Sequence, residues 1–164
     1  MIQLKDTLLL LARQQVDFVI IGGIAATLHG SVHQTFDLDV CYSRDLSNLD
    51  RLVAALSPHH PTLRGAPPNL PFIWDSATLR NGLNFTLHTA LGDLDLFGEV
   101  AGIGDFSAVK AKSKTLELFG HRFSVLTLSG LIVAKRAAGR AQDLRIIPEL
   151  EALLEATEGG ASEG

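Results

Sequence analysis

The sequence predicts an α/β (α+β) fold in which a mixed β-sheet is flanked by helices and followed by a helical carboxy-terminal segment. Short apolar runs of strand length alternate along the chain with longer segments whose apolar residues recur at helical spacing. The length of 164 residues suffices for one domain with its own core. We expect a single domain over residues 1–157, with the helices of 126–157 packed on it, and a disordered polar tail at 158–164.

In the first 71 residues, leucines spaced three or four apart predict helices, and short β-branched or apolar runs predict strands. The predicted helices cover 3–15, 24–29 and 43–56, and the predicted strands cover 18–21 and 36–42. Gly22 and Gly23 permit the turn between the first strand and its helix, and Gly30 closes that helix. Residues 57–71 hold five of the six prolines and are predicted to be a loop.

The second half of the chain follows the same two patterns. The predicted helices cover 75–81, 104–111, 127–138 and 141–156, and the predicted strands cover 84–88, 91–97, 115–118 and 122–125. Gly92 marks a tight turn, so the first two of these strands should form a hairpin. Gly139 should end a helix, and Pro148 should interrupt or restart the last one.

Acidic residues inside two apolar strands are the strongest functional signal. Asp37 and Asp39 are two positions apart, so in a strand their carboxylates lie on one face. Like charges at that spacing repel each other, and a divalent cation is the usual partner that stabilises them. Asp93 and Asp95 form a second pair of this kind on the predicted hairpin. A solvated strand face is the structural alternative for such a pattern.

The glycine turn before the acidic strand supplies the second half of a possible site. Gly22 and Gly23 follow a buried strand, and glycine allows a close approach of the backbone to a ligand. The free N–H groups of a helix start favour an anion such as phosphate. A phosphate-binding turn followed by an acidic strand indicates nucleotide and metal chemistry.

These residues resemble the signature of the nucleotidyltransferase (DNA polymerase β-like) superfamily. The resemblance rests on Gly22-Gly23 and Asp37-Leu38-Asp39, with support from the segment 131–144, and it spans about residues 16–150. The closer likeness is to small prokaryotic members related to toxin–antitoxin and abortive-infection nucleotidyltransferases. These relatives commonly carry an arginine where this chain has His33.

The resemblance implies a catalytic and metal-binding set of three carboxylates, Asp37, Asp39 and Asp95. They would hold two Mg²⁺ ions, or Mn²⁺ in their place. Asp93 competes with Asp95 for the third position, and its place at the strand entry favours Asp95. The nucleotide-binding residues would be Gly22, Gly23, Thr35 and Lys135. For Lys135 and the nearby Arg140, an exposed basic helix end is the alternative explanation.

The implied function is Mg²⁺-dependent transfer of a nucleoside monophosphate from an NTP, such as ATP, to a hydroxyl acceptor. The acceptor classes are tRNA, protein and small molecules, and an antitoxin or toxin partner is also expected. The main alternative is a non-catalytic binding module with the same fold. A weaker alternative is a metal-dependent phosphohydrolase that uses the same carboxylates.

Composition limits the remaining possibilities. Net charge is −4, but residues 110–145 contain eight of the fourteen Lys and Arg and only two acids, which suits a phosphate-bearing substrate. The single cysteine, Cys41, excludes an intrachain disulfide and is expected in the core. No apolar stretch is long enough to span a membrane, and the amino terminus lacks a signal-peptide pattern, so we expect a cytoplasmic protein with no membrane partner.

Overall fold

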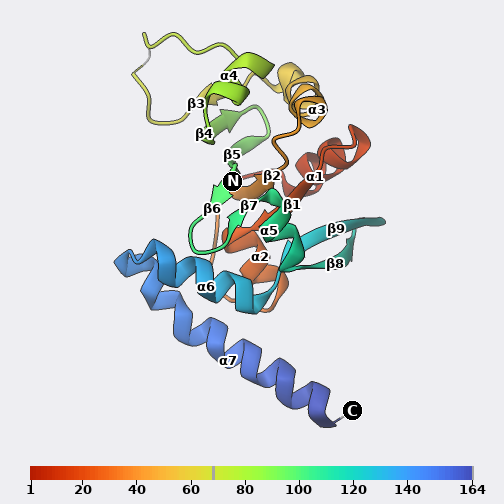
Figure 1. The fold of residues 1–164 in the computed structure, drawn as a ribbon, viewed down its shortest axis with the longest axis vertical. Helices are drawn as coiled ribbons and strands as arrows, with labels where there is room; N and C mark the ends of the chain where they lie inside the picture. The colour runs from red at the N-terminus through yellow and green to blue at the C-terminus, as the bar shows by residue number, and fades with distance from the viewer. Residues whose placement is uncertain (68, 164) are drawn as a thin grey trace.

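The computed structural model describes residues 1–67 and 69–163, with side chains described as far as residue 158. Its centre is a seven-stranded sheet in the order β3-β4-β5-β2-β1-β9-β8 (Figure 1). The strands span Phe18–Ile21 (β1), Leu38–Tyr42 (β2), Thr62–Leu63 (β3), Asn84–Thr89 (β4), Gly92–Phe97 (β5), Ser113–Leu118 (β8) and His121–Leu126 (β9). A separate two-stranded sheet pairs Glu99–Val100 (β6) with Gly104–Asp105 (β7).

The sheet is mixed, as the sequence predicts. Strand β2 runs parallel to β5 and antiparallel to β1, and β1 runs parallel to β9. The expected hairpin is present as β4 and β5, and β8 and β9 form a second antiparallel pair. Because β2 and β5 run in the same direction, equivalent positions on the two strands lie side by side with their side chains on the same face.

Helices surround this sheet. They span Leu4–Arg13 (α1), Gly22–Leu28 (α2), Leu46–Leu56 (α3), Ser76–Asn81 (α4), Phe106–Ala111 (α5), Leu128–Ala138 (α6) and Ala141–Glu163 (α7). Helices α3 and α4 lie near the β3-β4 end, whereas α6 and α7 lie together at the opposite end of the molecule (Figure 1). Helix α7 then extends away from the sheet towards the carboxy terminus.

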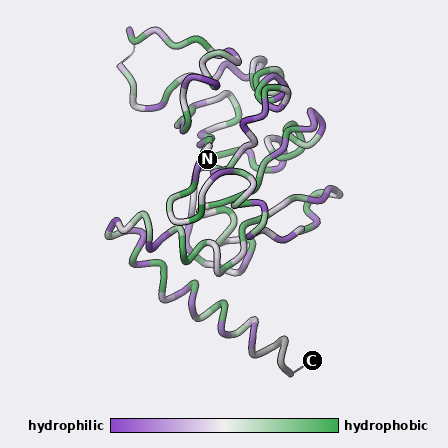
Figure 2. The backbone as a smooth tube through the Cα atoms, viewed as in Figure 1, coloured by the Kyte–Doolittle hydropathy of each residue, from purple (hydrophilic) through white to green (hydrophobic). Residues whose placement is uncertain are grey.

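The core is continuous through the sheet. All four residues of β1 are buried, so both faces of this strand are covered. The apolar residues of the central strands β1, β2 and β5 are mostly buried. Helix α1 and the coloured part of helix α7 alternate between hydrophobic and hydrophilic residues (Figure 2). That alternation is typical of helices that lay one apolar face on a core.

The predicted loop at 57–71 contains more structure than its prolines indicate. Residues Ser57–His59 form a short 3₁₀ helix, and Thr62–Leu63 form the edge strand β3. Strand β3 pairs with β4 through Thr62 opposite His88 and Leu63 opposite Leu87. The prediction of a loop was therefore wrong for these residues, because a two-residue edge strand is held by backbone pairing and leaves no periodic pattern.

Pro148 does not break the last helix, contrary to expectation. Helix α7 is continuous through it, although proline removes one backbone hydrogen bond at a typical cost of about 3 kcal/mol. Ile146, Ile147 and Leu150 are buried on both sides of the proline, and this packing holds the two halves in one helix. For the tail predicted at 158–164, Gly164 and the side chains of 159–163 lie outside what is described.

In the part of the chain that the structure covers, no helix has both the length and the apolar character of a membrane span.

Candidate active site

The carboxylates predicted from the sequence lie at the centre of the sheet. Asp39 on β2 is directly opposite Asp95 on β5 in the parallel register, and Asp37 immediately precedes β2. Two of the three residues thus share one face of neighbouring strands, although they are 56 positions apart in the chain. Asp95 is the partner of Asp39 in this register. Asp93 lies opposite His88, next to the turn between β4 and β5.

Burial makes the charge on this pair costly. The pKa of Asp39 is raised to about 7, first by its burial and then by the negative charges of Asp95 and Asp37. Burial also raises the pKa of Asp95, while hydrogen bonding and attraction from Arg64 oppose that shift. The Oδ1 atom of Asp39 is buried, and no hydrogen-bond partner for it occurs among the described residues. The site therefore needs positive charge.

Arg64 supplies part of that charge, and the sequence patterns did not single it out. Its Nη2 atom lies 2.9 Å from Asp95 Oδ1, donates a 3.1 Å hydrogen bond to Asp95 Oδ2, and lies 3.6 Å from Asp37 Oδ2. Its Nε atom lies 3.8 Å from Asp93 Oδ2. The Arg64 guanidinium thus contacts Asp37, Asp93 and Asp95. Asp39 is the one carboxylate of this cluster that it does not contact.

The glycine turn is shaped around the acidic strand. Gly22 has a φ of +66°, and a Cβ atom there would collide with the carboxylate of Asp39. A Cβ atom at Gly23 would come within 2.8 Å of the Thr35 side chain. Thr35 in turn donates a 3.3 Å hydrogen bond from Oγ1 to the backbone oxygen of Asp37. The two glycines are therefore required here for the close approach of α2 to the acidic strand.

A basic group faces the carboxylates, formed by Lys135 on α6 and by Arg140, which lies between α6 and α7. Lys135 Nζ donates a 3.2 Å hydrogen bond to Asp143 Oδ1, and Arg140 Nε donates a 2.7 Å hydrogen bond to Asp143 Oδ2. Asp143 is 1% exposed, and hydrogen bonds from Arg140 and Lys135 outweigh its burial and lower its pKa. Lys135 is half-buried and held, so it is not the freely solvated lysine of an exposed helix end.

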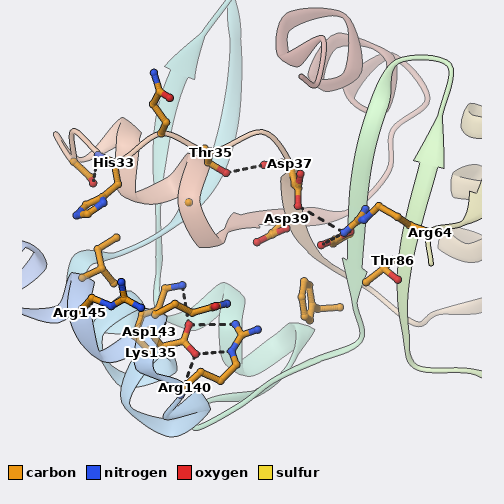
Figure 3. Close-up of a pocket in the computed structure, with 17 residues that line it drawn as sticks. His33, Thr35, Asp37, Asp39, Arg64, Thr86, Lys135, Arg140, Asp143 and Arg145 are labelled. Carbon is orange, nitrogen blue, oxygen red and sulfur yellow. Dashed lines mark hydrogen bonds and ion pairs between the residues drawn. The ribbon is translucent and has the colours of Figure 1, made fainter.

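Both groups line one cleft with a volume of about 830 Å³. Figure 3 shows Asp37, Asp39 and Arg64 on one side and Lys135, Arg140, Asp143 and Arg145 on the other. Gly23, Thr35 and Asp95 also line it. Of the predicted site residues, Gly22 is the one absent from this lining, because it lies beneath the Asp39 carboxylate.

His33 sits at the edge of the same cleft. Its Nε2 atom lies 3.2 Å from Glu149 Oε2 on α7, and its side chain is 57% exposed. The backbone N–H of His33 is turned towards Ser31 Oγ, to which it donates a 3.2 Å hydrogen bond. His33 therefore links the segment between α2 and β2 to α7 and does not contact the carboxylates.

The carboxylates have the donor chemistry that Mg²⁺ requires. Carboxylate oxygens are the ligands it prefers, and the unpartnered Oδ1 atom of Asp39 is suited to a cation. In the conformation described for residues 1–67 and 69–163, however, no three His, Cys, Asp or Glu side chains converge as a metal site. Arg64 occupies the position beside Asp95 and Asp37 instead.

Cys41 lies in the core, as expected. It is fully buried on β2, and burial raises the pKa of its thiol to about 12. A thiol with that pKa is protonated at neutral pH and is a poor nucleophile.

Two functional candidates were missed by sequence reasoning, Arg64 and Asp143. Arg64 lies in the proline-rich segment 57–71, whose composition predicts a loop, and no motif surrounds it. Asp143 is one of the two acids in the basic segment 110–145. An acid in that position signals a possible buried counter-charge, but its pairing with Lys135 depends on how α6 and α7 pack.

Comparison with known proteins supports the fold. No protein-family model and no curated protein matches the sequence significantly. Among solved structures, the chain is similar to a protein of Thermotoga maritima whose crystal structure is described as that of "a putative nucleotidyltransferase". The two share 14% sequence identity with a TM-score of 0.52, over 97% of this chain and 96% of the other. The chain therefore has a nucleotidyltransferase-like fold.

Proposed function

We propose that this protein is a Mg²⁺-dependent nucleotidyltransferase that transfers a nucleoside monophosphate from an NTP to a hydroxyl acceptor. The observation that carries the proposal is the pairing of Asp39 with Asp95 in one cleft with the basic group of Lys135 and Arg140. A nucleoside triphosphate would use both the carboxylates and the basic residues of the cleft. Its phosphates are anionic, and enzymes bind them as a complex with a metal ion. The fold is consistent with this activity.

The reaction would join the acceptor oxygen to the α-phosphorus and break the bond between that phosphorus and the oxygen bridging to the β-phosphate. Pyrophosphate leaves, and the hydroxyl proton passes to a carboxylate of the cluster. Asp37, Asp39 and Asp95 would hold the metal ions. When bound, these ions neutralise charge on the attacking and leaving oxygens.

This chain's own residues would place the substrate. The sequence resemblance assigns phosphate binding to the turn at Gly22 and Gly23, of which Gly23 lines the cleft. Lys135 and Arg140 neutralise phosphate charge across the cleft, and Asp143 holds both in place. Thr35 would hold the backbone just before β2 in place through its hydrogen bond to the backbone oxygen of Asp37. We assign it this positioning role.

The proposed acceptor is a molecule with a free hydroxyl group, and its class is a tRNA, a protein or a small molecule. Membership in a toxin–antitoxin pair, with a toxin or antitoxin partner, follows from the sequence resemblance alone and is proposed on that basis.

A second candidate is a binding module that has this fold but does not catalyse transfer. It is favoured by one observation, the ion pair between Arg64 and Asp95, which gives the carboxylates a positive partner without any metal. Under this alternative the cleft would bind a nucleotide or a protein partner, and the carboxylates would serve only to hold Arg64.

Label transfer distinguishes the two candidates. The protein is incubated with each of the four NTPs labelled at the α-phosphate, with Mg²⁺, tRNA and cell protein. We expect label to move to one acceptor class and to fall on the order of 10²-fold or more in Asp39→Asn, the scale of removing an electrostatic group that acts in a transition state. Glu117→Gln is the matched control, because it removes one negative charge from the exposed part of β8. Absence of transfer with every NTP and acceptor pool contradicts the enzyme.

A further inference from the structure

Arg64 is attached to the sheet in a way that keeps its side chain beside the carboxylates. It directly follows β3, and its backbone N–H donates a 2.9 Å hydrogen bond to the backbone oxygen of Thr86 on β4. Its Nη1 atom donates a 3.0 Å hydrogen bond to the backbone oxygen of Leu87. Both anchors belong to the strand adjacent to Asp95, so the guanidinium reaches the cleft across β4.

The guanidinium uses the oxygens that a metal ion would need. Nη2 lies within 3.1 Å of both carboxylate oxygens of Asp95 and 3.6 Å from Asp37 Oδ2. A Mg²⁺ ion binds such oxygens at about 2.0–2.1 Å and carries two positive charges, which would repel the guanidinium. The guanidinium and a metal ion therefore cannot share the Asp95 carboxylate in this arrangement.

Asp39 shows that Arg64 satisfies the cluster incompletely. No ion pair or hydrogen bond joins Asp39 to Arg64 among the described residues, and Asp39 Oδ1 is buried without a partner. Arg64 contacts Asp37, Asp93 and Asp95, and among the described residues it makes no such contact with Asp39. A cation that contacted Asp39 and Asp95 together would satisfy oxygens that the guanidinium leaves unpaired.

We propose that Arg64 is the resident counter-cation of the metal-free cluster and that a divalent metal ion binds by displacing its guanidinium from Asp95. The inference rests on the metal-binding part of the proposed function. The backbone anchor on Thr86 holds Arg64 at the edge of the cleft after displacement. The competition lowers the affinity for metal and limits the charge repulsion among the carboxylates when no metal is bound.

Direct metal titration tests this competition without any measurement of activity. Free Mn²⁺ is followed by electron paramagnetic resonance at constant ionic strength in wild type, Arg64→Gln and Arg51→Gln. We expect Arg64→Gln to bind Mn²⁺ about tenfold more tightly, the scale of one charge-assisted hydrogen bond that no longer has to be broken. Arg51 is the matched control, since its side chain is 35% exposed, against 32% for Arg64, and it pairs with Asp17 outside the cleft.

A measurement on the wild-type protein guards against misfolding of the variant. In protein labelled with ¹⁵N-arginine, the side-chain Nε–H resonance of Arg64 is assigned by its loss in Arg64→Gln. Addition of Mg²⁺ should shift this resonance while that of Arg51 stays in place.

Two outcomes overturn the inference. If Arg64→Gln binds Mn²⁺ no more tightly than wild type, Arg64 does not compete with the metal, although Mn²⁺ binding that Asp39→Asn abolishes would still uphold the metal site of the proposed function. If neither protein binds Mn²⁺ and the Arg64 resonance does not move, displacement by metal is excluded, and the label-transfer assay alone then decides the proposed function.

Discussion

The carboxylate of Asp39 occupies the space that a side chain at Gly22 would need. The two residues come from consecutive elements, with Gly22 at the first position of α2 and Asp39 on β2, and strand β1 pairs Ile21 with Asp39. The glycine is therefore part of the construction of the acidic site, in addition to any contact it makes with a phosphate.

Substitution of Gly22 by alanine should destabilise the protein through two effects. The residue has a φ of +66°, which L side chains rarely adopt, and the added methyl group would displace Asp39. We expect the free energy of unfolding to fall by roughly 2–3 kcal/mol in urea denaturation, the sum of backbone strain and displacement.

Gly120→Ala is the matched control for this substitution. Gly120 has a similar φ of +79°, but a Cβ atom there would meet no atom of the described residues within 4 Å. It should report backbone strain alone and cost about 1 kcal/mol. Equal losses in the two variants would show that Asp39 does not resist a side chain at residue 22.

Loss of the Asp143 carboxylate should lower the free energy of unfolding more than loss of the exposed ion pair between Arg136 and Glu151. It is fully buried and accepts hydrogen bonds from Lys135 and Arg140, so Asp143→Asn leaves two cations without their partner. We expect a loss of about 2 kcal/mol in the free energy of unfolding, reduced from the value for a fully buried pair because both cations are partly exposed.

The control for Asp143 is Glu151→Gln, which removes the exposed ion pair between Glu151 on α7 and Arg136 on α6. Surface pairs contribute little, so the expected loss is below about 0.5 kcal/mol. A loss at Glu151 as large as that at Asp143 would contradict the proposed role of the buried acid.

His29 should make the protein less stable in mild acid. Its Nε2 atom lies 2.8 Å from the backbone oxygen of Leu126, and burial lowers the pKa of the imidazole below its ordinary value of 6.5. The unfolded chain therefore binds more protons than the folded one, and stability falls as the pH drops through 6.5 until the lowered folded pKa is reached.

Thermal melting of His29→Gln at pH 7.5 and pH 5 checks this expectation. The variant should lose less stability than wild type over this interval, because glutamine does not titrate. His121→Gln, at an exposed position of β9, should keep the wild-type pH dependence. A wild-type slope in His29→Gln would show that another group is responsible.

The choice between the two carboxylates of β5 can be made by comparing their amide variants. Asp95 lies opposite Asp39, whereas Asp93 Oδ1 lies 2.8 Å from Nδ1 of the exposed His88. If the proposed activity is present, Asp95→Asn should reduce nucleotidyl transfer on the order of 10²-fold, and Asp93→Asn should leave it within about tenfold of wild type. The reverse order would assign the third carboxylate to Asp93.

The local sequence determined most of the elements and the identity of the acidic residues. Alternation along a strand is a property of adjacent residues, so Asp93 and Asp95 could be placed on one strand face without a structure, whereas Asp37 lies just before the strand that holds Asp39. Gly22 and Gly139 marked turns for the same reason, because positive φ angles are a local requirement.

Only the tertiary structure decided which of these residues meet. The position of Asp95 beside Asp39 depends on β2 and β5 pairing in parallel, and the position of Arg64 depends on a two-residue edge strand pairing with β4. The continuity of α7 through Pro148 likewise depends on buried isoleucines that contact the rest of the molecule. Such contacts join residues distant in the chain, and their energies are absent from any local pattern. The sequence by itself therefore identified three acids of the cleft and Lys135, and the packing of strands and helices brought them together and added Arg64 and Asp143.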